Sequence, residues 1–226
     1  MENSHISHNF DQAIAALRGE VLTMAGQTRH NLERAIQALF TRNVDLANAV
    51  IADDNEVDDF ERRVDKLGME LLVRFHPVAS DLRMVVSSMK ISINLERISD
   101  HATSIAKRAR KIAAHDELQE VNLVEPLYVL SDAMLRDATA AYSDHDAVLA
   151  VSLHQRDSEL NALHKKVTAA FSKRIEESGV RSQDYLHLLF VVRSLERVGD
   201  LSVNIGEDIV FLEAAKDVRH EQDRAL

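Results

Sequence analysis

The sequence predicts an all-α protein made of two tandem, internally repeated three-helix bundles with six long helices. The composition of six Gly, two Pro and 4% aromatic residues in 226 suits long helices better than sheets. Apolar residues recur at alternating steps of three and four, as packed helices require. One segment occurs twice, one hundred positions apart, and this repeat indicates a duplicated unit: Leu95-Glu96-Arg97-Ile98-Ser99-Asp100 and Leu195-Glu196-Arg197-Val198-Gly199-Asp200.

Three helices are predicted in the first half. The first covers roughly 10–40 and the second carries its apolar series over 46–71. His76-Pro77 ends the second helix, because the residue before a proline disfavours helical geometry. The third begins near Ser80 or Asp81 and continues to Ile112, and the polar stretch that follows is a connector. We therefore place the first bundle at 10–114.

The second half repeats this scheme. A helix begins around Pro126, which is acceptable in a first turn, and ends near Ser143. The next ends at Ser178-Gly179, where glycine can supply a left-handed cap, and the last follows apolar residues over 188–212. The charged tail after Asp217 is expected to fray. We place the second bundle at 123–216 and expect the two antiparallel bundles to be joined end to end.

Composition excludes several functional classes. A formal net charge of -10 argues against a nucleic-acid surface, because phosphate binding needs clustered Lys and Arg. Without Cys, the chain has neither a disulfide framework nor a thiolate metal site. The polar start lacks the apolar core of a signal peptide, and no run of about 18 apolar residues could span a membrane. We expect a cytoplasmic protein.

Carboxylates on two neighbouring helices form the candidate site. Glu96 and Asp100 lie four residues apart and so share one helix face. Asp54, Asp58 and Glu61 form a similar stripe on the preceding helix, and antiparallel packing would bring both stripes together. Facing carboxylates cannot all ionise cheaply unless a cation intervenes. An oxygen-rich site suits iron, manganese or magnesium, and nearby imidazole would widen the choice to zinc or nickel.

The corresponding residues of the second half differ in chemistry. Asp157, Asn161 and His164 lie on one stripe that faces Glu196 and Asp200. Asn161 stands where the second acid is expected, and His164 stands opposite Glu61 of the first repeat. The amide lowers the negative charge, while the histidine could serve as a neutral nitrogen ligand. We therefore predict that the first half binds metal more tightly than the second.

Two other interpretations remain open from the residues alone. Acidic pairs four apart are common on solvated helix faces, where Arg97 and Arg197 could neutralise them. The chain would then be a helical scaffold with no metal role. A carboxylate metal cluster could also activate water, as in a metal-dependent phosphohydrolase. Catalysis has weaker support, because the repeated helices carry no Glu-x-x-His pair and the chain has no Gly-rich phosphate loop.

The order and spacing of these motifs resemble the PhoU family from about Phe10 to Lys216. The resemblance rests on the two Leu-Glu-Arg-[Ile/Val]-x-Asp segments, the upstream Asp54-x-x-x-Asp58 and the loop from His76 to Arg83. It implies two three-helix bundles, a homodimer, and multinuclear iron or zinc clusters on the helices that bear the acidic motifs. The implied ligands are Asp54, Asp58, Glu96, Asp100, Asp157, Glu196 and Asp200, with Glu61, Asn161 and His164 as weaker candidates.

The resemblance also implies a regulator rather than an enzyme. Proteins of this family act in the cytoplasm as negative regulators of phosphate-starvation genes. They link the ATP-binding subunit of a phosphate ABC transporter to the sensor histidine kinase of a two-component system, and so touch membrane complexes only peripherally. The expected partners are therefore this kinase and this transporter, with no nucleic acid.

Overall fold

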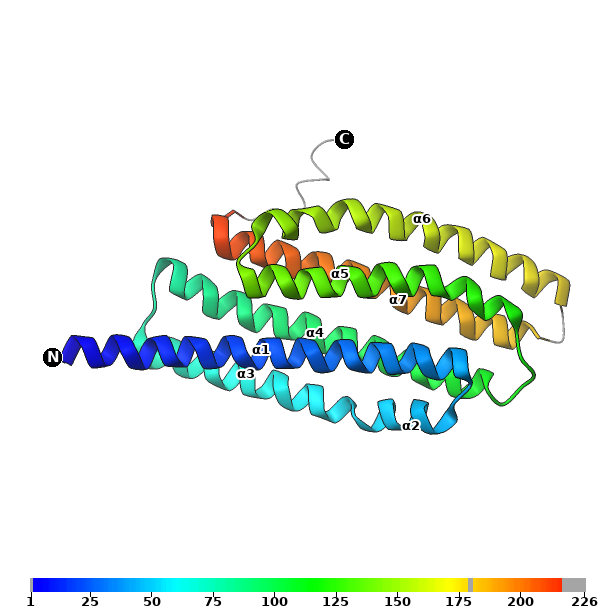
Figure 1. Ribbon diagram of the computed structural model, residues 1–226, viewed down its shortest axis with the longest axis horizontal. Coiled ribbons are helices and arrows are strands. Elements are labelled where there is room, and N and C mark those ends of the chain that lie inside the picture. Colours follow the sequence, from blue (N-terminus) through cyan, green and yellow to red (C-terminus); the bar gives the residue numbers. More distant parts are fainter. Residues whose placement is uncertain (1, 179–180, 217–226) are drawn as a thin grey trace.

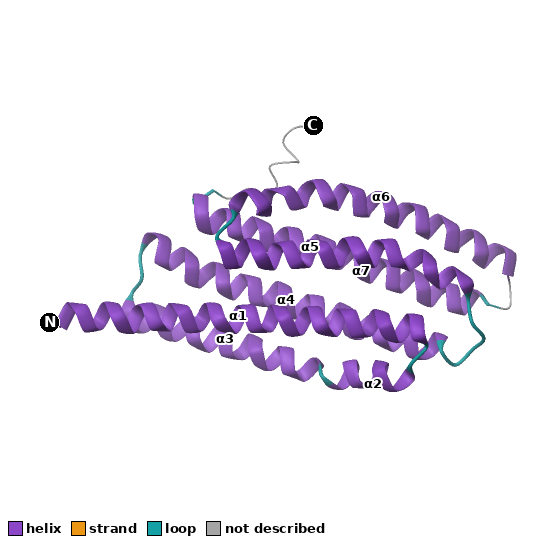
Figure 2. Cartoon of the chain, in the orientation of Figure 1, coloured by secondary structure: helices purple, strands orange, loops and turns teal. Residues whose placement is uncertain are grey.

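The computed structural model describes residues 2–178 and 181–216, and every regular element in these ranges is helical (Figure 2). This confirms the predicted all-α class. The proposed cap at Gly179 and the tail after Asp217 lie outside the described residues. The elements run antiparallel along the long axis (Figure 1): α1 Glu2–Thr41, α2 Val44–Ala52, α3 Asp54–Phe75, α4 Ala79–Ile112, the 3-10 helix η1 Gln119–Val124, α5 Glu125–Asp144, α6 Ala147–Ser178 and α7 Ser182–Ala214.

The second predicted helix is in fact two helices, α2 and α3, with a break at Asp53. Asp53 and its neighbours Asp54 and Asn55 are weak helix formers that compete for backbone hydrogen bonds. Asp53 is held by Arg34 of α1, whose Nη1 lies 2.5 Å from Oδ2. The Asn43 side chain caps α2 by accepting a hydrogen bond of 2.9 Å from the Leu46 amide. The apolar period continues through the break, so the sequence pattern did not reveal it.

Each half of the chain forms a three-helix bundle, in which α2 and α3 together take the place of one helix in the first half. In the first, α1 packs against α4, and the pair α2 and α3 covers both. In the second, α7 packs against α5 and α6. The first helix starts at Glu2, earlier than the predicted Phe10, and the predicted connector contains η1. His76 and His145 end α3 and α5 in the left-handed conformation, with φ of 49° and 57°.

The two bundles lie side by side along their length, and the expectation of an end-to-end arrangement is wrong (Figure 1). Their main interface is formed by α4 and α7, which run antiparallel. Arg83 Nε donates to the Leu212 carbonyl at 3.0 Å, and Ser87 Oγ donates to the Asp208 carbonyl at 3.1 Å. Both helices bury much more than one stripe, so a single bundle could not cover them. Side-by-side packing supplies the second neighbour.

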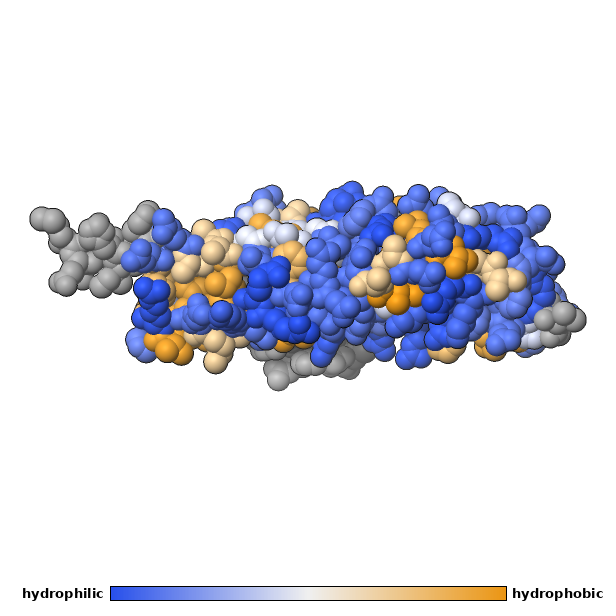
Figure 3. All heavy atoms as spheres, turned by 90° about the horizontal axis from the view of Figure 1, so that it is seen from below, coloured by the Kyte–Doolittle hydropathy of each residue, from blue (hydrophilic) through white to orange (hydrophobic). Residues whose placement is uncertain are grey.

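Most of the surface over α1, α2 and α3 is hydrophilic, with separate hydrophobic patches (Figure 3). Exposed apolar side chains gather where α3 ends and α4 begins: Met69 is 55% exposed, Val73 70%, Val78 72% and Leu82 40%. An exposed apolar patch at the rim of a helical bundle is typical of an interaction site. None of the described helices is both long and apolar enough to cross a membrane.

Candidate functional site

The first acidic cluster lies between α3 and α4. Asp54 stands in the first turn of α3, near the positive end of the helix dipole, and Asp58 and Glu61 follow one and two turns later. Glu96 and Asp100 lie on the facing part of α4. Antiparallel packing of the two helices therefore brings all five carboxylates into electrostatic contact.

Burial and crowding raise the pKa values of three carboxyl groups in this cluster. Burial, followed by Asp100, Glu61, Asp58 and Asp54, raises the pKa of Glu96 to about 7. Burial together with Asp54 and Asp58 raises the pKa of Asp100. Burial and the carboxylates of Asp65 and Asp58 raise the pKa of Glu61. Like charges with restricted solvation disfavour ionisation, and a bound cation would reverse this effect.

Ser99, the residue before Asp100 on α4, supports the first cluster. Its Oγ donates to Asp54 Oδ1 at 3.3 Å, and Asn31 of α1 donates to the same Oγ at 3.5 Å. Both Ser99 and Asn31 are buried. Neither was identified from the sequence, because a small polar residue within a helix seam carries no signal of its partner across the bundle. The position of Ser99 next to Asp100 was the only sequence feature that pointed to a role in the cluster.

The second cluster lies between α6 and α7 and is partly neutralised by the chain itself. Arg197 Nη1 donates to Asp200 Oδ2 at 3.0 Å, and its Nε lies 3.8 Å from Glu196 Oε2. Asn161 Nδ2 donates to Asp157 Oδ2 at 2.9 Å. By contrast, Arg97 at the corresponding place in the first half forms no ion pair within residues 2–178 and 181–216.

One acceptor of the second cluster remains unsatisfied. Asp157 Oδ1 is buried and has no hydrogen-bond partner among the described residues. Burial, followed by Asp200 and Glu196, raises the pKa of Asp157. Burial also raises the pKa of Asp200, although Arg197 and His164 oppose that shift. A buried carboxylate oxygen without a donor is an acceptor that a metal cation or its bound water would satisfy.

The repeated segments cross each other where α4 meets α7. A surface hollow of about 480 Å³ at the crossing is lined by four pairs of equivalent residues, each pair one hundred positions apart: Arg97 and Arg197, Asp100 and Asp200, His101 and Leu201, Ser104 and Asn204. The hollow therefore marks an internal pseudo-twofold axis. The two acidic clusters lie on either side of this axis.

The structure thus assembles the two predicted ligand sets in separate places, one in each bundle. Within the described ranges, no group of three or more His, Asp or Glu side chains is arranged to hold a single ion as it stands. The donor chemistry nevertheless fits an oxygen-seeking cation, since it comprises clustered carboxylates with raised pKa values and one unsatisfied buried oxygen. Ligation would require rotation of exposed or half-buried side chains on rigid helices.

Sequence comparisons agree with this arrangement. The family model described as "PhoU domain" matches the chain twice, at residues 21–109 and 125–209. The phosphate-specific transport system accessory protein PhoU homolog of Pseudomonas putida is 34% identical over 96% of this chain and 85% of its own length. The phosphate-specific transport system accessory protein PhoU of Escherichia coli K12 is 30% identical over 96% and 90% of the two chains.

Solved structures share the whole fold. The crystal structure of PhoU from Pseudomonas aeruginosa superimposes with a TM-score of 0.88 at 29% identity, over 92% of this chain and 100% of that one. The phosphate transport system regulatory protein PhoU from Streptococcus pneumoniae gives a TM-score of 0.85 at 25% identity, over 92% and 99%. With both bundles matched, the chain belongs to the PhoU domain family.

Proposed function

We propose that this protein is a regulatory accessory protein of phosphate transport and not an enzyme. The observation that carries the proposal is the match of both helical repeats to the PhoU domain, together with relatives named as phosphate-specific transport system accessory proteins over nearly the full chain. In this role the protein represses phosphate-starvation genes when phosphate is plentiful. The repeats at 10–114 and 123–216 are its two structural units.

The proposed mechanism is a coupling between two partners. The protein contacts the ATP-binding subunit of a phosphate ABC transporter and the cytoplasmic part of a sensor histidine kinase, and it acts as a homodimer. Contact with the transporter biases the kinase toward its inactive state through a coupling free energy. Long rigid bundles suit this task, because they hold two binding surfaces at a fixed separation.

The segment from Phe75 to Arg83 is the proposed contact with one partner. Val78 is 72% exposed, and Met69, Val73 and Leu82 extend the same apolar surface. An exposed group of apolar side chains is typical of a protein-protein contact, because docking of a partner would remove these side chains from water. Substituting Val78 and Leu82 with Asp should abolish regulation while leaving the helical content unchanged.

We further propose that the acidic clusters bind iron or zinc, with manganese or magnesium as alternatives. Asp54, Asp58, Glu61, Glu96 and Asp100 would hold metal in the first bundle. In the second the ligands would come from the following residues: Asp157, Asn161, His164, Glu196 and Asp200. A bound cation would supply the positive charge that these carboxylates lack and would fix α3 to α4 and α6 to α7.

The primary experiment measures secreted or periplasmic phosphatase activity in phosphate-replete cells, with and without this gene. High activity in the deletion strain, returned to a low level by the wild-type gene but not by Val78→Asp/Leu82→Asp, supports the regulator. Two exposed lysines of α6, changed as Lys165→Glu/Lys166→Glu, provide a control that should complement fully. Unchanged low activity in the deletion strain contradicts the proposal.

One observation favours a second candidate, the metal-dependent phosphohydrolase. A carboxyl group with a pKa of about 7, that of Glu96, could exchange protons at neutral pH beside a metal ion. Purified protein loaded with iron, zinc, manganese or magnesium would then hydrolyse a chromogenic phosphate monoester. Turnover that is lost in Glu96→Gln would favour the hydrolase over the regulator.

A further inference from the structure

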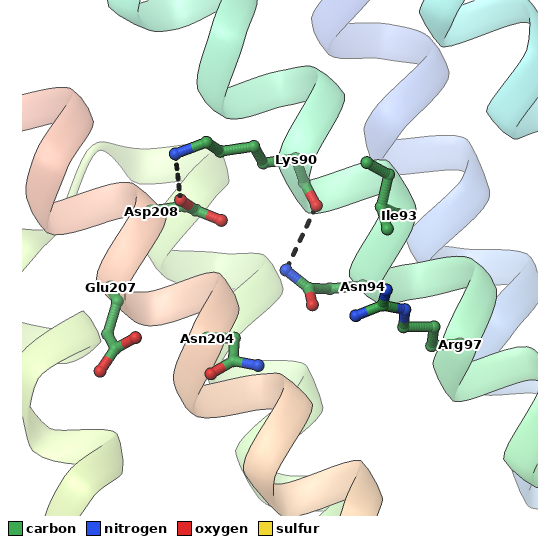
Figure 4. Close-up of a pocket in the computed structure, with 7 residues that line it drawn as sticks. All are labelled: Lys90, Ile93, Asn94, Arg97, Asn204, Glu207 and Asp208. Atoms are coloured by element: carbon green, nitrogen blue, oxygen red, sulfur yellow. Dashed lines mark hydrogen bonds and ion pairs between the residues drawn. The ribbon is translucent and has the colours of Figure 1, made fainter. Parts of the chain in front are cut away.

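We call the surface that α4 and α7 share along their contact the seam. Pseudo-twofold symmetry pairs each position on α4 with a position on α7, and the two ends of the seam differ in charge. At one end a groove of about 470 Å³ is lined by Lys90 on α4 and by Glu207 and Asp208 on α7 (Figure 4). Its charges are matched, since Lys90 Nζ lies 3.3 Å from Asp208 Oδ1. Glu207 Oε1 lies 3.8 Å from His154.

The symmetry-related end carries only positive charge at the equivalent positions. Lys107 and Arg108 stand where the first end has Glu207 and Asp208, and Arg193 stands where it has Ile93. Lys111 continues the same α4 face by one more turn. Within residues 2–178 and 181–216, none of these four cations forms an ion pair.

The charge of this end acts on a neighbouring histidine of α7. Burial lowers the pKa of His187, with Arg108 and Lys111 adding to the effect although Asp184 opposes it. The cations of α4 therefore act electrostatically across the seam on α7.

The cationic end also presents apolar surface. Arg108 Cζ lies 4.5 Å from the ring centroid of Phe190, a residue that is 49% exposed. Leu186, one turn earlier on α7, is 45% exposed. Arg108 Nε is buried and has no hydrogen-bond partner in the described part of the chain. Arginine stacked on an exposed aromatic ring is the composition that characterises protein-protein hot spots.

We propose that Lys107, Arg108, Lys111 and Arg193, with Phe190 and Leu186, form a docking surface for an acidic segment of a partner protein. The charge of this end is opposite to the net charge of -10 carried by the chain, so it attracts an anionic partner that the rest of the molecule repels. The cations come from two helices and extend over a full turn of α4, which suits a row of carboxylates better than a single phosphate ion. Phe190 and Leu186 suit an apolar residue within that row.

This surface lies at the opposite end of α4 from the Phe75 to Arg83 segment, so it adds a second contact to the proposed regulator. A purified-protein binding measurement tests it without reference to the phosphatase phenotype. Failure of binding would therefore leave the proposed function standing, and failure of complementation would leave the docking surface standing.

The experiment measures fluorescence anisotropy of a labelled peptide that is rich in Glu and contains Phe. Wild type should bind it, with affinity falling as salt rises, because the contacts are exposed charges. Arg108→Glu/Arg193→Glu should weaken binding at least about tenfold. The exposed pair Lys107→Glu/Lys111→Glu provides an independent test that does not disturb the Arg108 and Phe190 contact, and it should weaken binding by a similar factor.

Lys165→Glu/Lys166→Glu introduces the same change in net charge on α6 and serves as the matched control. Its affinity should stay within about twofold of wild type, because these exposed lysines lie on α6 and not on the α4 and α7 surface that would contact the peptide. Equal weakening by the control and the seam variants would overturn the proposal. Binding of inorganic phosphate or duplex DNA in place of the peptide, with loss in the same variants, would also overturn it.

Discussion

The two acidic clusters have nearly the same helical geometry but different electrostatics. In the first bundle burial and the crowded carboxylates raise the pKa values of Glu61, Glu96 and Asp100. The adjacent Arg97 forms no ion pair in the described ranges, although it lowers the pKa of Glu61. In the second bundle Arg197 pairs with Asp200 and Glu196, and Asn161 replaces an acid. A duplicated fold can therefore keep the positions of its ligands while single substitutions change the charge that a cation would meet.

The largest expected effect is a difference in metal affinity between the two clusters. Glu96→Ala/Asp100→Ala removes both α4 carboxylates of the more acidic cluster and should lower the affinity for iron or zinc by more than about 100-fold. Glu196→Ala/Asp200→Ala should cost less, because Arg197 already offsets part of that charge. Elemental analysis after purification measures both. Equal losses in the two variants, or a parent protein that binds no metal, would contradict the prediction.

A second comparison concerns Ser99 and Gly199, one of the two positions at which the repeated segments differ. A Cβ on Gly199 would lie 2.2 Å from Leu160 Cδ2 of α6, so Gly199→Ala should lower the free energy of unfolding by about 1–3 kcal/mol. Ser99→Ala at the equivalent position loses two long side-chain hydrogen bonds, to Asp54 at 3.3 Å and from Asn31 at 3.5 Å, together worth roughly 0.5–1.5 kcal/mol. Urea denaturation measures the free energy of unfolding of both variants, and the loss should be larger for Gly199→Ala. A larger loss for Ser99→Ala would mean that Leu160 moves aside easily.

The pH dependence of stability should also differ between the clusters. The pKa of Glu96 rises from 4.5 to about 7 on folding, so the stability of the metal-free protein is full below the unfolded value and falls as pH rises toward 7. Glu96→Gln should remove this decline and stabilise the metal-free protein at pH 7 by on the order of 1 kcal/mol, after allowance for solvent screening. Thermal unfolding at pH 4.5 and 7 measures it, and an unchanged pH slope would contradict it.

The smallest effect tests the arginine that neutralises the second cluster. Arg197→Gln removes the ion pairs to Asp200 and Glu196 and should raise the metal affinity of the second bundle by roughly fivefold, the equivalent of about 1 kcal/mol. Arg97→Gln serves as the matched control and should change the first bundle by less. Competition with a metal-sensitive dye reports both affinities. A gain of the same size in both variants would show that the pairing of Arg197 is irrelevant.

Much of this architecture could be predicted from local sequence. The period of apolar residues indicated the long helices, and the spacing of Glu96 and Asp100 placed both on one face. The break at Asp53 was missed because α2 and α3 continue one apolar period. The ion pair that holds Asp53 comes from Arg34, which lies on a different helix. The roles of Ser99 and Gly199 were missed for the same reason, since each depends on a side chain more than thirty residues away.

Local sequence was enough to predict the all-α class, the duplication and the set of acidic residues, because helix periodicity and composition are local properties. The side-by-side arrangement of the bundles could not be predicted in this way. That choice depends on α4 and α7 each burying a second face, which requires a partner helix distant in the chain. The same packing brought Lys107, Arg108 and Lys111 of α4 and Arg193 of α7 into one cationic surface.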